Sequence, residues 1–214
     1  MGKSDWQQIK HSHNLSGFFK GLWLCASPKT ILKLDQIGVR GKLLHWIEAF
    51  LTGHCQWVVI DGVYSEWAAV TSGAPQGSVI GPLLFLIYTN DIGSNLSSST
   101  RLFADDYTIY REVSKQSDCE MLQMDLNNLH IWTQKWQLSL NASKCKAMRF
   151  TNKWKLNHYV YHLNNTPLEW CESYKYLGVI LTRSWLGMTM HVSEVKLKAT
   201  RILNLLRQTM YGCN

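Results

Sequence analysis

Residues 101–111, with the sequence RLFADDYTIYR, constrain the fold more than any other stretch of the chain. Aromatic, aliphatic and β-branched residues flank Asp105 and Asp106 on both sides, which is typical of two strands. Because aspartate tolerates turn geometry, the pair predicts the tip of a β-hairpin. Two adjacent carboxylates repel each other unless water or a cation lies between them. The tip is therefore either a solvated turn, which is the commoner case, or a site for a hard cation such as Mg²⁺.

The charge balance favours an anionic partner. The chain of 214 residues carries 22 Lys and Arg against 15 Asp and Glu, a net charge of +7, and the basic residues concentrate in 144–155 and 196–207. Nucleic acid is the first candidate for such a surface, although many basic domains bind no anion. The hydrophobic content of 46% supports a packed core.

The six cysteines are irregularly spaced and none forms a Cys-x-x-Cys pair, so the sequence shows no zinc motif. With no signal peptide at the start, reduced thiols inside a cell are expected. The longest apolar run, residues 79–88, is too short to span a bilayer. We therefore expect an intracellular protein, nuclear or cytoplasmic, with no membrane partner.

The first part of the chain predicts a frayed end, two helices and a hairpin. Residues 1–16 are polar and lack a clear period, which favours a frayed terminus. Residues 31–38 and 41–53 have the apolar spacing of helices. Two strands, 56–60 and 65–70, flank the dipeptide Asp-Gly, a strong signal for a tight hairpin turn.

The segment 71–78, TSGAPQGS, predicts a loop whose backbone can approach a ligand closely, because it holds two glycines and a proline. Ser78 is placed to cap the helix that follows. That helix, residues 79–92, is apolar nearly all round and is expected to be buried. Its first backbone N–H groups could bind an anion, although an ordinary helix start has the same pattern.

A long helix is predicted after the acidic hairpin, because apolar residues recur on one face. They are Leu122, Leu126, Leu129, Trp132 and Trp136. Strands are expected at residues 146–150 and 174–181, with a hairpin between them formed by residues 159–163 and 167–170 around Asn164 and Asn165. Residues 189–210 predict a basic amphipathic helix.

Four motifs follow one another in a fixed order: SGAPQGS, FADD, LSLNASKCK and YLGV. Together they resemble the reverse transcriptases of non-LTR, LINE-type retrotransposons, from about residue 31 to the end of the chain. The resemblance implies an α+β fold: a right-hand polymerase palm with an antiparallel sheet backed by helices, the start of a helical thumb, and fingers largely missing. It divides the chain into a degenerate segment 1–30, a palm at 31–182 and the start of a thumb helix at 183–214.

The resemblance also implies the chemistry. The 3′-hydroxyl of a DNA primer attacks a dNTP opposite an RNA template, with two Mg²⁺ ions holding the reacting oxygens and no other small-molecule cofactor evident. Asp105 and Asp106 match the metal-binding catalytic pair, and Lys144 matches a lysine near the leaving pyrophosphate. The positions that match the nucleotide and template loop are Ser72, Gly73, Pro75, Gln76 and Gly77. Those that match the turn at the primer end are Tyr176, Leu177 and Gly178.

One required acid is absent. The family carries a further metal-binding aspartate on the strand before the first palm helices, and an ungapped comparison places Gly17 there and Leu22 at the aromatic position that screens the sugar. Losing that carboxylate should remove several kcal/mol of transition-state stabilisation. The sequence therefore predicts an impaired polymerase. The alternatives are a non-catalytic nucleic-acid-binding module and the product of a decayed retroelement.

Overall fold

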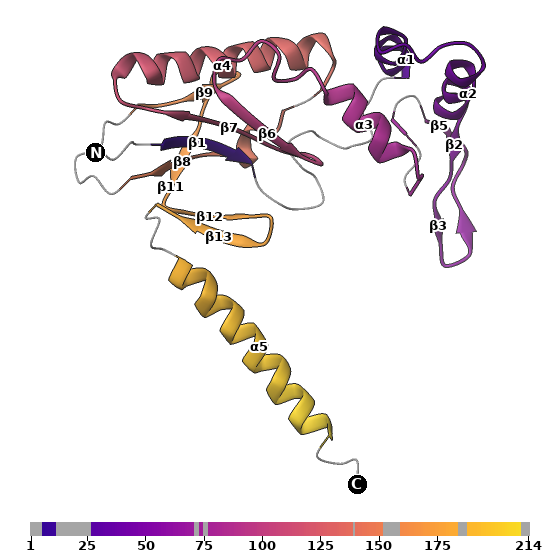
Figure 1. Cartoon of the computed structure of the whole chain (residues 1–214). Coiled ribbons are helices and arrows are strands. Elements are labelled where there is room, and N and C mark those ends of the chain that lie inside the picture. Colours follow the sequence, from indigo (N-terminus) through magenta and orange to yellow (C-terminus); the bar gives the residue numbers. More distant parts are fainter. Residues whose placement is uncertain are drawn as a thin grey trace.

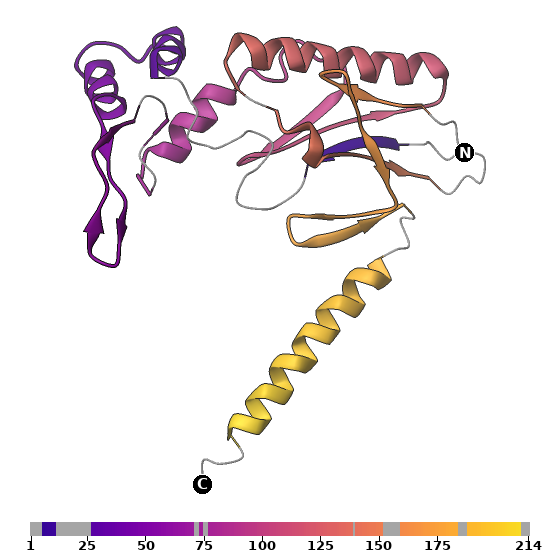
Figure 2. The same cartoon turned by 180° about the vertical axis from the view of Figure 1, so that it is seen from behind.

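The computed structural model describes residues 6–11, 27–70, 73–74, 77–138, 140–151, 159–183 and 188–210. Within these ranges the chain is a mixture of helices and small sheets, so the predicted α+β class is confirmed. A five-stranded sheet lies beneath one long helix, a helical part with a two-stranded ribbon lies to one side, and a last helix projects away from the body (Figure 1). The view from behind shows the same layers (Figure 2).

The five-stranded sheet has the order β11-β8-β1-β7-β6. Its strands are β1 (Trp6–His11), β6 (Ser99–Phe103), β7 (Asp106–Glu112), β8 (Cys145–Phe150) and β11 (Glu169–Cys171). The central strand β1 is antiparallel to β7 on one side and to β8 on the other. β6 is antiparallel to β7, whereas the edge strand β11 runs parallel to β8.

The prediction of a frayed terminus is wrong for residues 6–11. The sequence WQQIKH has no strand period of its own, yet these residues form the central strand of the sheet. The reason is pairing on both sides: Trp6 lies opposite Glu112 on β7 and opposite Phe150 on β8. Hydrogen bonding to a neighbouring strand on each side can override a weak local propensity for strand structure.

Helix α4 (Gln116–Lys135) covers one face of the sheet, and its predicted apolar face is confirmed. The five residues on that face, from Leu122 to Trp136, are all buried. They pack against Tyr107 and Ile109 of β7 and against Ala147 of β8 in the main hydrophobic core. Burial of this helix face against the sheet is the largest source of hydrophobic stabilisation in the described chain.

The start of α4 depends on Asp118, whose carboxylate accepts hydrogen bonds from the backbone N–H groups of Ser114 and Lys115, each at 2.8 Å. These bonds lower the pKa of Asp118 below its ordinary value of 3.8. A carboxylate with a lowered folded pKa stabilises the folded state above its unfolded pKa, and this contribution is lost as the pH falls through the folded pKa.

We therefore expect the free energy of unfolding to fall as the pH drops below about 4, and to fall less in Asp118→Ala than in the parent chain. Denaturant unfolding at several pH values between about 6 and 2 measures the difference. Equal pH slopes in the two proteins would contradict this role of Asp118.

The helical part consists of α1 (Ser27–Gln36), α2 (Lys42–Leu51) and α3 (Gly81–Thr89). All three contribute to a second, smaller core of Leu34, Ile47, Leu51 and Leu84. The prediction that α3 is buried all round is corrected here, because Leu83 and Leu86 are more than half exposed. α3 lies between two cores and has a third side that no described residue covers.

A two-stranded ribbon extends from α2. The predicted turn is confirmed: Asp61 has φ 50° and Gly62 has φ 83°, the left-handed values that a tight hairpin turn requires. Cys55 pairs with Ala69 and Val59 with Tyr64 along the ribbon. Its four short strands are β2 (Cys55–Gln56), β3 (Val59–Ile60), β4 (Val63–Tyr64) and β5 (Ala68–Ala69).

The segment after β8 forms two small hairpins. The first, β9 (His162–Leu163) with β10 (Thr166–Pro167), turns at Asn164 and Asn165 as predicted, and the chain then continues into β11. The predicted single strand 174–181 is wrong. The chain folds back at Leu177 and Gly178, which divides it into β12 (Ser173–Tyr176) and β13 (Val179–Thr182). Positive φ at both turn residues produces the reversal.

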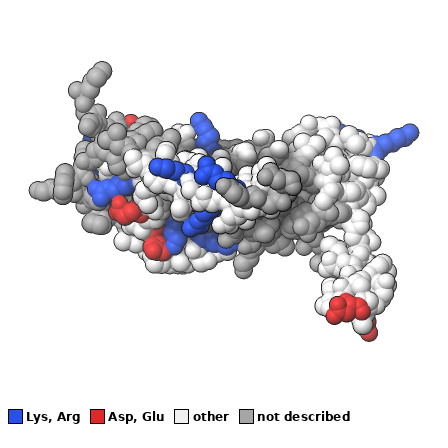
Figure 3. All heavy atoms as spheres, turned by 90° about the horizontal axis from the view of Figure 1, so that it is seen from below, with Lys and Arg blue, Asp and Glu red and all other residues white. Residues whose placement is uncertain are grey.

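The last helix, α5 (Met188–Met210), projects from the body and its side chains are largely exposed (Figure 1). Its exposed basic residues are Lys196, Lys198, Arg201 and Arg207. The face of the molecule seen from below carries Lys and Arg side chains over its central part (Figure 3). Among the described helices, none is both long enough and apolar enough to cross a membrane.

Candidate active site

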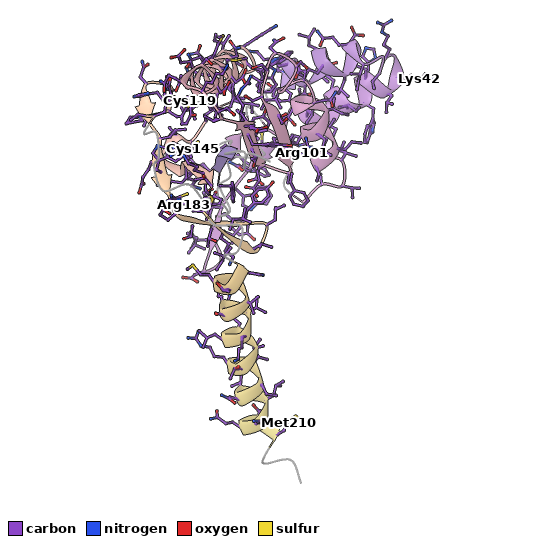
Figure 4. The ribbon with its side chains drawn as sticks, turned by 60° about the vertical axis from the view of Figure 1, so that its left-hand side comes forward. Lys42, Arg101, Cys119, Cys145, Arg183 and Met210 are labelled. Atoms are coloured by element: carbon purple, nitrogen blue, oxygen red, sulfur yellow. The ribbon has the colours of Figure 1, made fainter. Side chains whose placement is uncertain are left out.

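The acidic hairpin predicted from the sequence is confirmed. β6 and β7 form an antiparallel pair in which Phe103 lies opposite Asp106, so the chain reverses through Ala104 and Asp105. Ala104 takes the left-handed φ of 49° that a two-residue turn needs. Asp105 is half-buried at the tip, whereas Asp106 is only 3% exposed as the first residue of β7. Arg101 on β6 marks this hairpin in Figure 4.

The base of the hairpin is packed closely. A Cβ on Gly93 would come within 2.9 Å of Thr100 Oγ1, so only glycine allows the turn after α3 to approach β6 this closely. Burial raises the pKa of Tyr107 well above its ordinary value, which keeps its hydroxyl neutral in the packing beside Thr100. The base of the hairpin is therefore closely packed around a neutral tyrosine.

Asp125 holds the start of β6 and was missed by sequence reasoning. Its buried carboxylate accepts hydrogen bonds from the backbone N–H groups of Ser97 at 2.9 Å and Ser98 at 2.8 Å. Arg111 Nη1 of β7 lies 3.7 Å from the same carboxylate. The signal was present in the sequence, because Asp125 falls between Leu122 and Leu126 on the apolar face of α4.

Three strand ends meet at the edge of the sheet where the acidic tip lies. β7 begins there with Asp106. β1 ends there, since Lys10 lies opposite Thr108, and β8 begins there, since Cys145 lies opposite His11. Lys144 directly precedes Cys145, as the last residue of a short 3₁₀ helix, Ala142–Lys144. Because neighbouring strands are about 4.8 Å apart, β7 and β8 are separated by roughly 10 Å. The structure thus brings Asp105, Asp106 and Lys144 to one edge.

The loop before α3 is described only in part. Gly73 has φ 97° and Gly77 has φ 80°, so both predicted glycines adopt a conformation that other residues rarely take. Ser78 Oγ accepts a hydrogen bond at 3.1 Å from the N–H of Gly81, the first residue of α3, but the N-cap position is Ile80, so Ser78 is not the cap that the sequence predicted. Ser72, Pro75 and Gln76 lie outside the described residues. The role of this loop at the acidic hairpin remains a prediction.

The predicted primer-end residues lie in the turn of the β12–β13 hairpin. Leu177 has φ 47° and Gly178 has φ 84°, and Tyr176 pairs with Val179 next to them. Within the described chain, β12 and β13 pair only with each other, so this turn is not part of the five-stranded sheet. Their role at a primer end is likewise a prediction.

The two carboxylates of the hairpin offer the hard oxygen ligands that Mg²⁺ prefers. The described ranges contain no group of three His, Cys, Asp or Glu that could hold a metal ion. Gly17 and Leu22 lie outside those ranges. The described residues therefore fit part of a divalent-metal site and do not complete one.

The chain was compared with known proteins. The family described as "Reverse transcriptase (RNA-dependent DNA polymerase)" matches residues 15–181. The RNA-directed DNA polymerase from mobile element jockey of Drosophila funebris is 33% identical over 165 residues, which cover 72% of this chain and 18% of the relative. The probable RNA-directed DNA polymerase from transposon X-element of Drosophila melanogaster is 30% identical over 156 residues, which cover 70% of this chain and 17% of the relative.

A third relative is the retrovirus-related Pol polyprotein from type-1 retrotransposable element R1 2 of Nasonia vitripennis, 24% identical over 147 residues. These cover 64% of this chain and 36% of that protein. The chain spans less than a fifth of the length of the two Drosophila relatives, with shares of 18% and 17%. The chain therefore belongs to the reverse transcriptase (RNA-dependent DNA polymerase) family, as a partial chain of the LINE-type, non-LTR retrotransposon group.

Proposed function

We propose that residues 31–182 are the palm of an RNA-directed DNA polymerase, that residues 1–30 replace its first strand in degenerate form, and that residues 183–214 contribute to a thumb. One observation carries the proposal: the ends of β1, β7 and β8 meet where the acidic hairpin turns. A five-stranded sheet, antiparallel except for β11, has a long helix on one face and holds these ends in place. The edge gathers two carboxylates and a lysine, which suits the binding of a metal and a triphosphate.

Asp105 and Asp106 would hold divalent ions, Mg²⁺ in the proposal, and such ions stabilise the charge that develops on the attacking and leaving oxygens. Asp105, which is half-buried, would contact an ion directly. Asp106, almost fully buried, would support the site from the start of β7. Carboxylates that a folded turn already holds would need little reorganisation when an ion binds.

Lys144 would act from directly before the start of β8, which β1 separates from the acidic hairpin. Its ammonium would neutralise the leaving pyrophosphate and donate a proton to it. The backbone of Gly73 and Gly77 would approach the incoming dNTP and the template, together with Ser72, Pro75 and Gln76. The turn at Tyr176, Leu177 and Gly178 would hold the primer end, and the lysines and arginines of α5 would bind the phosphates of the RNA–DNA duplex.

Primer extension on an RNA template with Mg²⁺ tests the proposal. We expect the unaltered chain to be at or near background, because it has Gly17 at the position of the third carboxylate. Gly17→Asp is expected to raise extension by about two orders of magnitude, the effect of restoring part of the metal site. β1 ends at His11, six residues before Gly17. A second variant, Ser12→Asp, therefore introduces the acid at the residue that directly follows β1.

The outcomes separate the proposal from its alternative. Extension by the unaltered chain at the level of Gly17→Asp would contradict the proposed impairment. Salt-dependent binding of an RNA–DNA duplex by all three proteins, with no extension by any, would instead identify a non-catalytic nucleic-acid-binding module.

A further inference from the structure

Lys33 of α1 is an unusual residue, because it is a lysine that is 4% exposed. Lysine is almost never fully buried unless its charge is paired. Here the ammonium donates hydrogen bonds to the backbone oxygen of Tyr88 and to Oδ1 of Asp91, at the end of α3. Lys33 is not part of the proposed site at the acidic hairpin.

Three aromatic rings surround the same ammonium. Lys33 Nζ lies 3.9 Å from the ring centroid of Trp136, 4.7 Å from that of Trp132 and 5.1 Å from that of Tyr88. Each ring face attracts a cation. Tyr88 OH donates a hydrogen bond to the backbone oxygen of Trp136, so two of the three aromatic residues are also linked to each other. One side chain from α1 is therefore held by directed contacts from α3 and from the end of α4.

This position is the joint between the two cores of the molecule. The small core unites α1, α2 and Leu84, while Phe85 and Tyr88 of α3 belong to the main core with α4 and the sheet. α1 packs on α2 and on α3, and α4 ends close to α3 (Figures 1 and 2). Beside Lys33, Lys29 Nζ donates a hydrogen bond to the backbone oxygen of Lys135. Directed polar contacts from α1 thus cross the joint.

We propose that Lys33 is a positioning residue, and that its caged ammonium fixes the orientation of residues 27–70 relative to the sheet. Replacing both partners of a buried ion pair by apolar side chains of similar volume often leaves stability unchanged, whereas the directional contacts are lost. Here only Lys33 is buried, and Asp91 is 44% exposed, so its carboxylate stays solvated when Lys33 is replaced. A charge at this joint therefore selects one orientation among several that apolar packing alone would allow. The proposal depends on the geometry of the joint and not on catalysis.

The orientation matters for the proposed polymerase, and this consequence rests on the proposed function. The chain leaves the ribbon at β5, passes Gly73 and Gly77, and enters α3. The angle between the helical part and the sheet therefore sets how far the glycine loop lies from the acidic hairpin. A joint that turns freely would separate the groups that must meet on one dNTP.

Electron–electron distance measurements between two spin labels test the joint. The labels are attached to genetically encoded non-natural residues at Ala49 on α2 and Met124 on α4, both exposed, so that the native cysteines stay in place. The parent chain is expected to give one narrow distance distribution. Lys33→Met, which keeps the length of the side chain, is expected to give a broader distribution with a shifted maximum, while its melting temperature stays within about 4 °C of the parent.

Lys42→Met is the matched control, because Lys42 is an exposed lysine at the start of α2, on the far side of the helical part (Figure 4). It is expected to leave the distribution unchanged. A parent-like distribution in Lys33→Met would overturn the proposal, as would equal broadening in Lys42→Met. If Lys33→Met does not fold, Asp91→Ala decides in the same way, because Asp91 is 44% exposed and its replacement removes only one contact of the ammonium. None of these readings requires polymerase activity.

Discussion

Asp105→Asn in a chain that also carries Gly17→Asp is expected to lower primer extension by about two orders of magnitude, which returns it to background. Asp105 lies at the tip of the β6–β7 turn and is half-buried, so its carboxylate is accessible to an ion from outside. Asparagine keeps the size and turn preference of the side chain, but it is neutral and binds a hard cation weakly. The loss would therefore report on the metal and not on the fold of the hairpin.

Two other variants sharpen this test. Asp61→Asn is the matched control, because Asp61 is also an aspartate in a tight hairpin turn but lies at the far end of the ribbon. Extension should not change in this variant. Asp106→Asn is expected to have a smaller effect than Asp105→Asn, since Asp106 is almost fully buried. An Asp106→Asn loss larger than that of Asp105→Asn would reverse the roles proposed for the two acids.

Metal binding gives a second measurement that does not require turnover. Mn²⁺ broadens the NMR signals of nuclei near its site, so amides of the turn at Ala104 and Asp105 should broaden in the parent chain and not in Asp105→Asn. Equal broadening in both proteins would place the ion elsewhere. This measurement also applies if Gly17→Asp fails to restore extension.

Local sequence patterns predicted the parts of the fold whose physical cause is local. The dipeptides Asp61-Gly62 and Asn164-Asn165 mark turns because these residues tolerate positive φ, and both turns are present. The apolar face of α4 was visible because a helix buried on one side repeats its apolar residues every three or four positions. The acidic hairpin was found in the same way, from two apolar strands around a polar turn.

The failures have non-local causes. β1 carries no pattern that identifies it as a strand, and it becomes central only because β7 and β8 pair with both of its edges. The local pattern of residues 174–181 missed the turn at Leu177, which only the resemblance to the family indicated, because leucine rarely adopts positive φ and the segment otherwise has strand-forming residues. The exposure of Leu83 and Leu86 on α3 depends on how many neighbours surround that helix, which composition does not specify.

The candidate site shows the same division. The motifs identified the adjacent pair Asp105 and Asp106 and the distant Lys144, and the pairing of β1 with β7 and β8 explains how the pair and the lysine reach one edge of the sheet. The buried lysine at the joint between the two cores was not predicted. Lys33 resembles any helical lysine in the sequence, and only its contacts with Tyr88, Asp91 and the two tryptophans distinguish it.

Asp125→Ala is expected to lower the free energy of unfolding by about 3 kcal/mol, the largest effect on stability that we predict. The carboxylate is 2% exposed and receives the N–H groups of Ser97 and Ser98. Ser97 Oγ donates a further hydrogen bond to it at 3.0 Å. With alanine, the buried N–H of Ser98 loses its acceptor and Arg111, whose side chain is 18% exposed, loses its nearby anion.

Denaturant unfolding followed by circular dichroism measures this loss, with Glu120→Ala as the control, because Glu120 is an exposed acid on the same helix. Asp125→Asn should cost less, about 1.5 kcal/mol, because the amide oxygen can still accept one of the N–H groups while the charge near Arg111 is lost. Since Asp125 joins α4 to the start of β6, its loss should also loosen the acidic hairpin at the other end of that strand. Amide hydrogen exchange should therefore rise along β6 and β7 in Asp125→Ala and stay at the parent rate in Glu120→Ala. A stability equal to that of Glu120→Ala would show that the contacts of Asp125 do not hold the hairpin in place.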